Sequence, residues 1–467
     1  MMDKDRDRKR RLKFSAFIIS LMILAASCMT SCGAREDGEV RFPGEFEPMS
    51  GVAVAWPLDL PMDLIKQMGE NVEVHVIIDP NNTDDSEKDV QKALSEAGVS
   101  MEKIKIHTHE MVSPYLRDYG AFFVFRNGKP EIVNFDNSIE GMDEMPGETF
   151  GVAFAKELGL PSTTSTIHMD GGNLMSDGRG TAVSDLLVTR TNGRNVDRVR
   201  KELRRVMGIE NYILTIDPQG GTIEHVDCWA KYLSPDKVLV ARVPKEHPRY
   251  DQYEKIAGLF ETTLCCWGYP YRVYRVDEPL TSGDPADPPT APYTNSLILN
   301  KHVYLPLGDD DEFNAKAIDV YKKALPGYEI HGFKSDGSFL QWMNTDALHC
   351  RTHEIPDDNM VFVDHYNVLH DSVEFEDSYR IEARIIPYSG SGIKEAKVFH
   401  RTGKGDWAES EMQFDSEKDV YACELKGYKE GQTVEYYLYG MDEKGNEGTQ
   451  PYCGGDDPHR FTIRDEQ

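Results

Sequence analysis

The chain has 467 residues, and its 52 Lys and Arg against 80 Asp and Glu give a formal net charge of −28. So acidic a chain is not expected to bind nucleic acid, which requires a basic surface, but it attracts cationic ligands. It is too long for one average domain, and its eight cysteines are too few for a scaffold built on disulfides.

The N-terminus has the pattern of an export signal. A start rich in Lys and Arg leads into an apolar run at 14–27, which is shorter than the ~20 residues of a membrane-spanning helix. The run ends in "LAASC", which is similar to a bacterial lipoprotein signal. Cys28 would then be acylated, with Cys32 or ordinary signal-peptide cleavage as alternatives. We expect residues 1–33 to be signal peptide and tether, and the mature chain to be an exported, membrane-anchored lipoprotein at the bacterial cell envelope.

Strand-like and helical patterns alternate through residues 40–372, which we expect to form the larger domain. Strands are predicted at 72–79, 128–135, 237–243 and 301–307, and helices at 196–207 and 315–324. Several strands follow one another in hairpin-like succession. Repeating αβ units around a closed ring therefore fit this region better than an all-parallel sheet.

The pattern changes near residue 373. In 375–467, short alternating runs (379–386, 395–400 and 433–440) are separated by Gly, Asp and Asn turns at intervals of roughly ten residues. This is typical of an antiparallel β-sandwich of the immunoglobulin type. Cys423 and Cys453 are candidates for a disulfide there, although neither belongs to a Cys…Trp…Cys frame. We expect adhesion, packing or spacing from this module rather than chemistry.

Four stretches of the larger body are dense in reactive side chains. They are "YLRDYGAFFVF" (115–125), "HMDGGNLMSDG" (168–178), "TIEHVDCWAKYLSPDKVLVARV" (222–243) and "TDALHCRTHEIP" (345–356). Each alone has a simple structural interpretation: an ion pair, a glycine turn, a buried histidine or a core cysteine. Taken together, four ionisable groups beside tight turns or strand ends indicate a site.

Two of these stretches predict how their side chains point. His225 and Asp227 are two residues apart on an expected strand, so they should face the same side. His349 and Cys350 are adjacent, so on an extended strand they should face opposite sides. Asp170 precedes a pair of glycines that permits close backbone approach.

Metal binding and disulfide formation are the first alternatives for Cys350. His225, Asp227, His349, Cys350 and His353 supply ligand types for zinc, but no spacing typical of a zinc site is present. A disulfide from Cys350 to Cys228, or to the Cys265–Cys266 pair, has no support from the sequence.

The third alternative is that Cys350 is a nucleophile. The carboxylates near it decide whether its thiol can react. Carboxylates beside a thiol raise its pKa and weaken it as a nucleophile, unless the substrate is itself a cation. Two carboxylates can grip a guanidinium group, and the bound cation then favours the thiolate. At ~4 Å and an effective dielectric constant of ~20, one such charge contributes about 4 kcal/mol, or roughly three pKa units.

The four stretches resemble those of the agmatine deiminase and bacterial peptidylarginine deiminase family of guanidine-modifying enzymes. The resemblance extends from "FEPMSGVAVAWP" (46–57) through "YTNSLILNKHVYLP" (293–306) to "TDALHCRTHEIP". The export signal and the trailing module are more similar to the peptidylarginine branch. The resemblance implies the pentein fold, a five-bladed pseudo-symmetric α/β propeller with its site on the central axis, followed here by the β-sandwich.

The resemblance also implies roles for four residues. Cys350 would attack the guanidinium carbon and form a thiouronium adduct, while Asp118 and Asp227 hold the guanidinium nitrogens. His225 would protonate the leaving ammonia and then activate water. The product is a ureido group, and neither a cofactor nor a metal is implied.

Further residues match the family at substrate-binding positions. Asn295 would orient the nucleophile, and Arg117, Asp170, Gly171 and Trp56 are the remaining candidates. The chain departs from many relatives in having Tyr115 where they have a tryptophan two residues before the Arg-Asp pair. The stacking wall of the pocket is therefore expected to differ.

Substrate choice depends on the loop at 133–148, "VNFDNSIEGMDEMPGE". It holds no Lys or Arg and five acidic residues (Asp136, Glu140, Asp143, Glu144 and Glu148). If it borders the pocket, it repels an arginine with a free α-carboxylate, unless a distant Arg supplies a clamp. We predict a peptidylarginine deiminase acting on internal arginine. The alternatives are an agmatine deiminase, an amidinotransferase or a non-catalytic surface binding protein; the oligomeric state is not predicted.

Overall fold

The structure is a computed structural model, and it describes residues 38–136, 150–220, 223–281, 283, 288–335 and 342–464. All its elements belong to one compact unit, Val40–Gln467. The predicted signal segment with Cys28, and most of the acidic loop, lie outside the described residues. None of the helices in the described ranges has the length and apolar character needed to cross a membrane.

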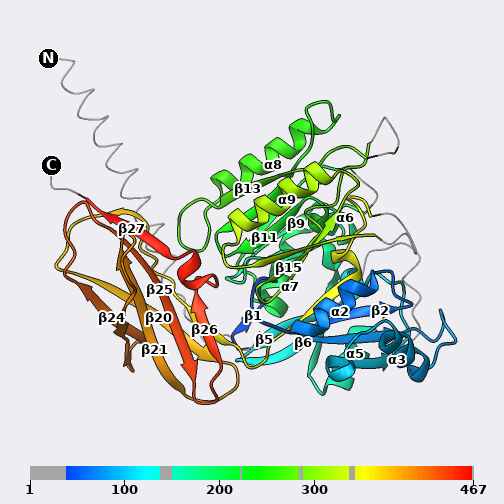
Figure 1. Cartoon of the computed structure of the whole chain (residues 1–467), viewed down its shortest axis with the longest axis horizontal. Coiled ribbons are helices and arrows are strands. Elements are labelled where there is room, and N and C mark those ends of the chain that lie inside the picture. The colour runs from blue at the N-terminus through cyan, green and yellow to red at the C-terminus, as the bar shows by residue number, and fades with distance from the viewer. Residues whose placement is uncertain are drawn as a thin grey trace. The chain divides into compact units, whose positions relative to one another are not determined.

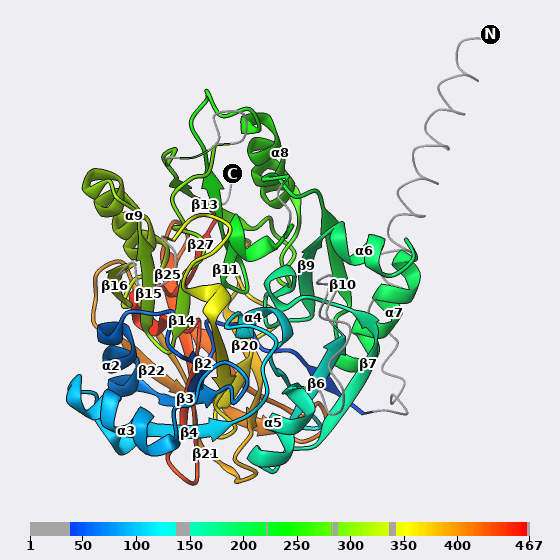
Figure 2. The same cartoon turned by 90° about the vertical axis from the view of Figure 1, so that its right-hand side faces the viewer.

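In the described part of the chain, five sheets form the larger body, which Figures 1 and 2 show from two sides. Their strands, in sheet order, are β17 (Thr352–Pro356), β2 (Met49–Trp56), β3 (Glu73–Ile78), β4 (Ile104–Thr108); β1 (Val40–Arg41), β5 (Phe122–Arg126), β6 (Lys129–Asp136), β7 (Ser162–His168); β10 (Asn211–Thr215), β9 (Thr181–Asp185), β8 (Met175–Ser176); β11 (Ala230–Ser234), β12 (Lys237–Arg242), β13 (Arg272–Asp277); and β14 (Leu297–Leu299), β15 (His302–Leu307), β16 (Glu329–Lys334).

Each sheet contains the same unit, in which an antiparallel pair is followed by a parallel partner. Thus β11 pairs with β12 antiparallel and β12 with β13 parallel, and the other four sheets repeat this order. A parallel neighbour requires a crossover, which a helix provides. The mixed α/β class is therefore confirmed. The closed five-bladed ring stays a prediction.

The crossover helices lie toward the outside of the body (Figure 2). The crossover helices are α2 (Met62–Asn71), α3 (Glu87–Glu96), α5 (Phe150–Leu158), α6 (Leu187–Thr191), α7 (Val196–Met207), α8 (Tyr250–Thr262) and α9 (Asp311–Ala324). The short helix α4 (Leu116–Tyr119) lies between β4 and β5, near the centre of the body in Figure 2. The helix predicted at 196–207 is confirmed, because Asn195 caps its start and Gly208 ends it in the left-handed region, at φ 72°. The helix predicted at 315–324 begins earlier, since Asp310 accepts the backbone N–H groups of Glu312 and Phe313.

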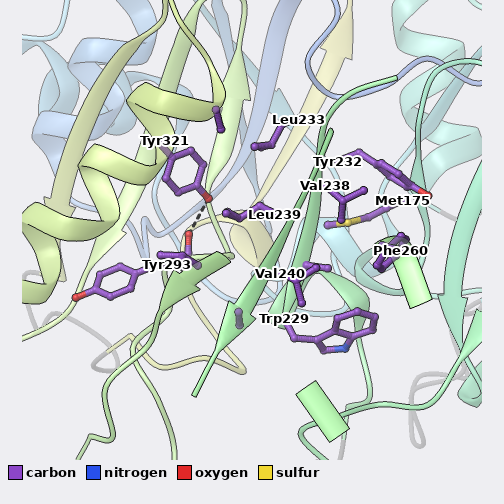
Figure 3. Close-up of a cluster of buried hydrophobic side chains, with 14 of the residues drawn as sticks. Met175, Trp229, Tyr232, Leu233, Val238, Leu239, Val240, Phe260, Tyr293 and Tyr321 are labelled. Atoms are coloured by element: carbon purple, nitrogen blue, oxygen red, sulfur yellow. Dashed lines mark hydrogen bonds between the residues drawn. The ribbon is translucent and has the colours of Figure 1, made fainter. Parts of the chain in front are cut away.

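The core around Trp229 supports the segment that carries His225 and Asp227. Trp229 is fully buried and shares one core with side chains of β12 and α8; Val240 of β12 lies beside it, with Phe260 of α8 on the same side of the strand (Figure 3). The Tyr321 hydroxyl donates to the Tyr293 carbonyl oxygen at 2.8 Å, which ties α9 to the segment that leads into β14.

Two further sheets share one core in the C-terminal part. One contains β18 (Val361–Asp364), β20 (Ser378–Pro387), β24 (Val420–Lys426) and β23 (Gln413–Asp415); the other contains β19 (Asp371–Val373), β27 (His459–Ile463), β25 (Thr433–Asp442), β21 (Ile393–Thr402), β22 (Ala408–Glu411) and β26 (Glu447–Gln450). The three predicted strands of this region are confirmed. The immunoglobulin type of this region and the expected domain limits, 40–372 and 375–467, stay predictions. Strand β18, which lies before residue 372, pairs with β20 of the C-terminal region.

Cys423 and Cys453, the two candidates for a disulfide, are not paired in the structure. Both cysteines are free. Cys423 packs against the core shared by the two C-terminal sheets, whereas Cys453 belongs to the core around Trp229. The chain leaves the sandwich after β26, so Cys453 is buried in one core while the partly buried Cys423 packs against another.

Candidate functional site

Four short turns bring the predicted stretches together. They are α4, η2 (Gly171–Asn173), η3 (Val226–Cys228) and η4 (His349–Arg351), and they pack against one another. The predicted strand for His225 and Asp227 is wrong, because His225 lies at the start of the 3-10 turn η3 and Asp227 lies within it. The extended geometry assumed for His349 and Cys350 is also wrong, since η4 is another such turn.

Cys350 is buried and held by Asn295. The Asn295 amide nitrogen donates to the Cys350 sulfur at 3.3 Å. Its amide oxygen accepts the backbone N–H groups of Cys350 and His349, at 3.3 and 2.9 Å. The Cys350 sulfur also lies 3.7 Å from Asp227 Oδ2. The structure thus fixes the thiol beside one carboxylate and one amide donor.

Asp227 is the first member of a buried chain of charged groups. His349 Nδ1 lies 2.7 Å from Asp227 Oδ2, and His349 Nε2 lies 2.8 Å from Glu45 Oε2. Glu45 in turn accepts from Lys231 Nζ at 2.7 Å. Burial opposes the ionisation of Asp227, but the hydrogen bond to His349 holds the pKa of this carboxyl below its ordinary value. The pKa of Glu45 is likewise held low, against burial, by Lys231 and His349.

Asp118, Asp170 and His225 form the other half of the site. His225 Nδ1 lies 3.4 Å from Asp118 Oδ1, and His225 Nε2 lies 3.5 Å from Asp170 Oδ2. Burial, together with the charges of Asp170 and Asp227, raises the pKa of Asp118 to about 7. Burial would lower the pKa of His225, but Asp118 and Asp170 raise it well above its ordinary value. Apart from this ion pair, Asp118 Oδ1 and His225 Nδ1 have no hydrogen-bond partner among the described residues, so both buried atoms can still bond to a ligand.

The glycine pair allows these groups to meet, as the sequence predicted. A Cβ atom on Gly171 would lie 1.8 Å from the carbonyl oxygen of Arg117. A Cβ atom on Gly172 would lie 2.6 Å from His225 Nδ1 and 3.0 Å from Asp227 Oδ1. The same glycine therefore faces the histidine and the carboxylate, and no other residue fits there without displacing them.

Arg117 and Trp56 are engaged elsewhere. The Arg117 guanidinium pairs with both carboxylate oxygens of Glu354, at 3.2 and 2.5 Å, and not with Asp118. It also donates to the His349 carbonyl oxygen at 3.4 Å, so that it supports η4. The Trp56 indole donates to Asp85 at 2.9 Å and lines a separate cavity of about 600 Å³.

Tyr115 lies beside η4, as its position before the Arg-Asp pair implies. Its hydroxyl donates to Asp346 Oδ2 at 3.1 Å, and Asp346 pairs in turn with the Arg351 guanidinium at 2.6 Å. Burial and the negative charge of Asp346 raise the pKa of Tyr115 to about 12. Tyr115 is therefore uncharged, and Asp346, which pairs with Arg351 next to Cys350, holds it in place.

The zinc-ligand set considered from the sequence is not assembled. Both ring nitrogens of His349 face carboxylates, and His353 directs Nδ1 to the Glu354 carbonyl oxygen at 3.2 Å. Within the described ranges, Asp227 and Cys350 share a cluster of possible ligands with Cys228 instead.

Three members of the site were missed or set aside at the sequence level. Glu45 and Lys231 belong to none of the arguments from motifs, and His349 was interpreted only as a metal ligand. Glu45 is 304 residues from His349 and 186 from Lys231. The sequence offers one hint: Lys231 belongs to the third reactive stretch, where it stands among apolar residues.

The comparison with protein families assigns the chain to the hydrolytic guanidine-modifying deiminases. A family model described as Porphyromonas-type peptidyl-arginine deiminase matches residues 41–356. The chain belongs to this family, so the resemblance and the predicted enzyme class are confirmed.

Known relatives agree with this assignment. The agmatine deiminase of Pseudomonas syringae pv. syringae is 24% identical over 297 residues, which are 56% of this chain and 79% of that protein. A relative from Vibrio parahaemolyticus is 26% identical over 225 residues, which are 43% of this chain and 61% of its own length. The solved structure of the Enterococcus faecalis agmatine deiminase is similar in fold, with a TM-score of 0.58 at 18% identity over 70% of this chain and 98% of that one.

Proposed function

We propose that the chain hydrolyses the guanidinium group of a cationic substrate, with Cys350 as the nucleophile and Asp118 and Asp227 as the groups that hold the cation. The observation that carries this proposal is the 3.7 Å distance between the Cys350 sulfur and Asp227 Oδ2. A carboxylate so close to a thiol hinders its ionisation unless a cation binds between them. The neighbouring Asp118, also buried, gives such a cation a second carboxylate.

The roles that the resemblance implies give the following reaction at these residues. The Cys350 sulfur attacks the guanidinium carbon, and the resulting tetrahedral intermediate loses ammonia as His225 supplies a proton. A thiouronium adduct remains. Water then attacks this carbon, His225 takes a proton from the water, and the carbon–sulfur bond breaks to release the ureido product. Asn295 keeps the sulfur in place through both steps, since it contacts the thiol and the backbone of η4.

The charges around the site favour a guanidine without a neighbouring carboxylate. Arg117, Arg351 and Lys231 are each paired with a carboxylate of the chain. A substrate carboxylate would have to break one of these pairs. Agmatine is therefore the preferred small substrate, in agreement with the names of the curated relatives. Internal peptidyl arginine is the second candidate, supported by the description of the family model and by the resemblance to the exported branch.

A substrate comparison tests the proposal. The purified chain is incubated with agmatine, free arginine, and peptides with internal or C-terminal arginine, and ammonia and ureido product are measured. Release from agmatine, or from internal arginine, supports the corresponding branch. No release from any substrate contradicts the deiminase function and leaves a binding protein. Transfer of the amidino group to an added amine would instead show an amidinotransferase.

Two variants and a chelator complete this experiment. Cys350→Ala should abolish turnover, whereas Cys423→Ala, which lies in β24 of the C-terminal sandwich, should retain it. Turnover by Cys350→Ala would overturn the assignment of the nucleophile. Chelation with EDTA should leave the rate unchanged, because the proposed steps need no metal.

We also propose three structural features: a closed five-bladed propeller, an immunoglobulin-like C-terminal module and a lipid anchor at the N-terminus. Five sheets with one repeated pairing order support a closed five-bladed propeller, and two sheets around one core support an immunoglobulin-like module. The sequence of 1–33 supports acylation at Cys28 after export. A mature N-terminus at Cys28 carrying lipid, measured by mass spectrometry, is the expected result; an intact residue 1 would contradict it.

A further inference from the structure

Cys228 lies beside Cys350 in the structure. It is fully buried at the end of η3, directly after Asp227. The sulfur atoms of Cys228 and Cys350 and a carboxylate oxygen of Asp227 all lie within 4.8 Å of one another. Both thiols are reduced. A disulfide bond has a sulfur–sulfur distance of ~2.05 Å, so the two sulfur atoms need to approach each other by less than ~3 Å to form one.

One segment anchors both cysteines. The Thr294 hydroxyl donates to the Cys228 carbonyl oxygen at 3.0 Å, and the next residue, Asn295, donates to the Cys350 sulfur at 3.3 Å. Gln219 donates to the same Cys228 carbonyl oxygen at 3.1 Å. Because Thr294 and Asn295 hold η3 and η4 together, the two sulfurs stay neighbours.

We propose that Cys228 is a resolving cysteine, which captures Cys350 after oxidation by a hydroperoxide and closes a reversible disulfide over the nucleophile. The proposal rests on the proposed function only for its effect on turnover. The formation of the disulfide itself depends on the geometry alone.

The chemistry has two steps. The Cys350 sulfur attacks the O–O bond of the hydroperoxide and takes one oxygen as the thiol gives up its proton; the O–O bond breaks, the leaving oxygen takes this proton to become water or alcohol, and a sulfenic acid remains. The Cys228 sulfur then attacks the Cys350 sulfur; the S–S bond forms, the S–O bond breaks, and water leaves. The two thiols lose two electrons and the hydroperoxide gains them.

Asp227 is placed to pass the proton of the Cys228 thiol to the hydroxyl group that leaves as water in the second step. The Cys228 sulfur lies 3.5 Å from Asp227 Oδ1, whereas the Cys350 sulfur contacts the other carboxylate oxygen, Oδ2. The hydrogen bond with Cys350 and burial raise the pKa of Cys228 well above its ordinary value. Cys228 therefore keeps its proton until Cys350 is oxidised, and it does not compete for the substrate.

Peptide mapping tests the disulfide directly. The wild-type chain is treated with one equivalent of hydrogen peroxide, its free thiols are blocked, and it is digested with trypsin without reduction. We expect peptide 206–231 linked to peptide 335–351, with the loss of two hydrogens. Cys265 and Cys266 fall in one peptide, 256–272, so a bond between them has a different signature. Absence of the linked peptides, with Cys350 in a sulfinic acid, would overturn the proposal.

Recovery of activity tests its consequence. After peroxide and then dithiothreitol, the wild type and the control Cys423→Ser should regain most of their own untreated activity. Cys228→Ser should regain little, because Cys350 proceeds to the sulfinic acid. Equal recovery by Cys228→Ser would contradict the resolving role. If Cys228→Ser is inactive from the start, the oxidation state of its Cys350 is read by mass spectrometry instead. A chain that forms the linked peptides without any turnover would contradict only the deiminase function.

Discussion

His349 and Asp227 share a buried hydrogen bond of 2.7 Å between Nδ1 and Oδ2. His349 precedes the cysteine in the chain, but it acts on the carboxylate that faces the cysteine. On its other side it contacts Glu45, which is paired with Lys231. The histidine next to Cys350 therefore positions the charge of the site, a role that its place in "LHC" alone does not reveal.

Replacing His349 by Gln should move the acid limb of the pH–rate profile to higher pH. His349 lowers the pKa of Asp227, and the carboxylate must be ionised to hold the cation. Without the histidine this pKa rises, so activity is lost sooner as the pH falls. Hydrogen bonds to charged groups contribute about 1.5–3 kcal/mol, so we expect kcat/KM to fall by roughly 10- to 100-fold at neutral pH. His302→Gln, on β15, is the control; an unchanged acid limb in His349→Gln would contradict this role.

Substrate affinity should depend on the ionisation of Asp118. Its pKa is about 7, so the site carries less negative charge below this pH and binds a guanidinium less tightly. In the Cys350→Ala background, agmatine affinity measured by calorimetry should rise as the pH increases through about 7 and then level off. Adding Asp118→Asn should flatten the profile at low affinity. A profile independent of pH in the single variant would show that Asp118 does not contact the substrate.

The helices and strands followed from local patterns where caps and alternation agree. The helix at 196–207 was predicted correctly because Asn195 and Gly208 mark its ends. The turns η3 and η4 were not, because a three-residue 3-10 turn leaves no periodicity to detect. The residue types of the site were visible in the sequence, but their pairing was not. The contact between Glu45 and His349 joins residues that lie 304 positions apart in the chain. It depends on how separate sheets pack together, which no local sequence pattern predicts.

Replacing Asp118 by Asn should stabilise the chain at neutral and alkaline pH while it removes activity. The pKa of Asp118 is about 7 in the folded state, above its ordinary value of 3.8. The folded state therefore binds a proton more tightly than the unfolded state, and stability falls as the pH rises between these two values. Above about pH 7 the buried charge is fully unfavourable, so the amide should raise the free energy of unfolding by about 2 kcal/mol. Thermal unfolding at pH 8 and pH 4 checks this, since the gain should vanish at the lower pH.

Replacing Gly172 by Ala should reduce turnover far more than it reduces stability. The added methyl group would lie 2.6 Å from His225 Nδ1 and 3.0 Å from Asp227 Oδ1, so both side chains must move. Displacements of about 1 Å in a catalytic group lower rates by roughly 100-fold, which is the expected fall in kcat/KM. The matched control is Gly258→Ala in α8, where a methyl group meets nothing within 4 Å and should stabilise the helix by about 1 kcal/mol. Full activity in Gly172→Ala, measured with the substrate that the wild type accepts, would show that His225 and Asp227 need not keep these positions.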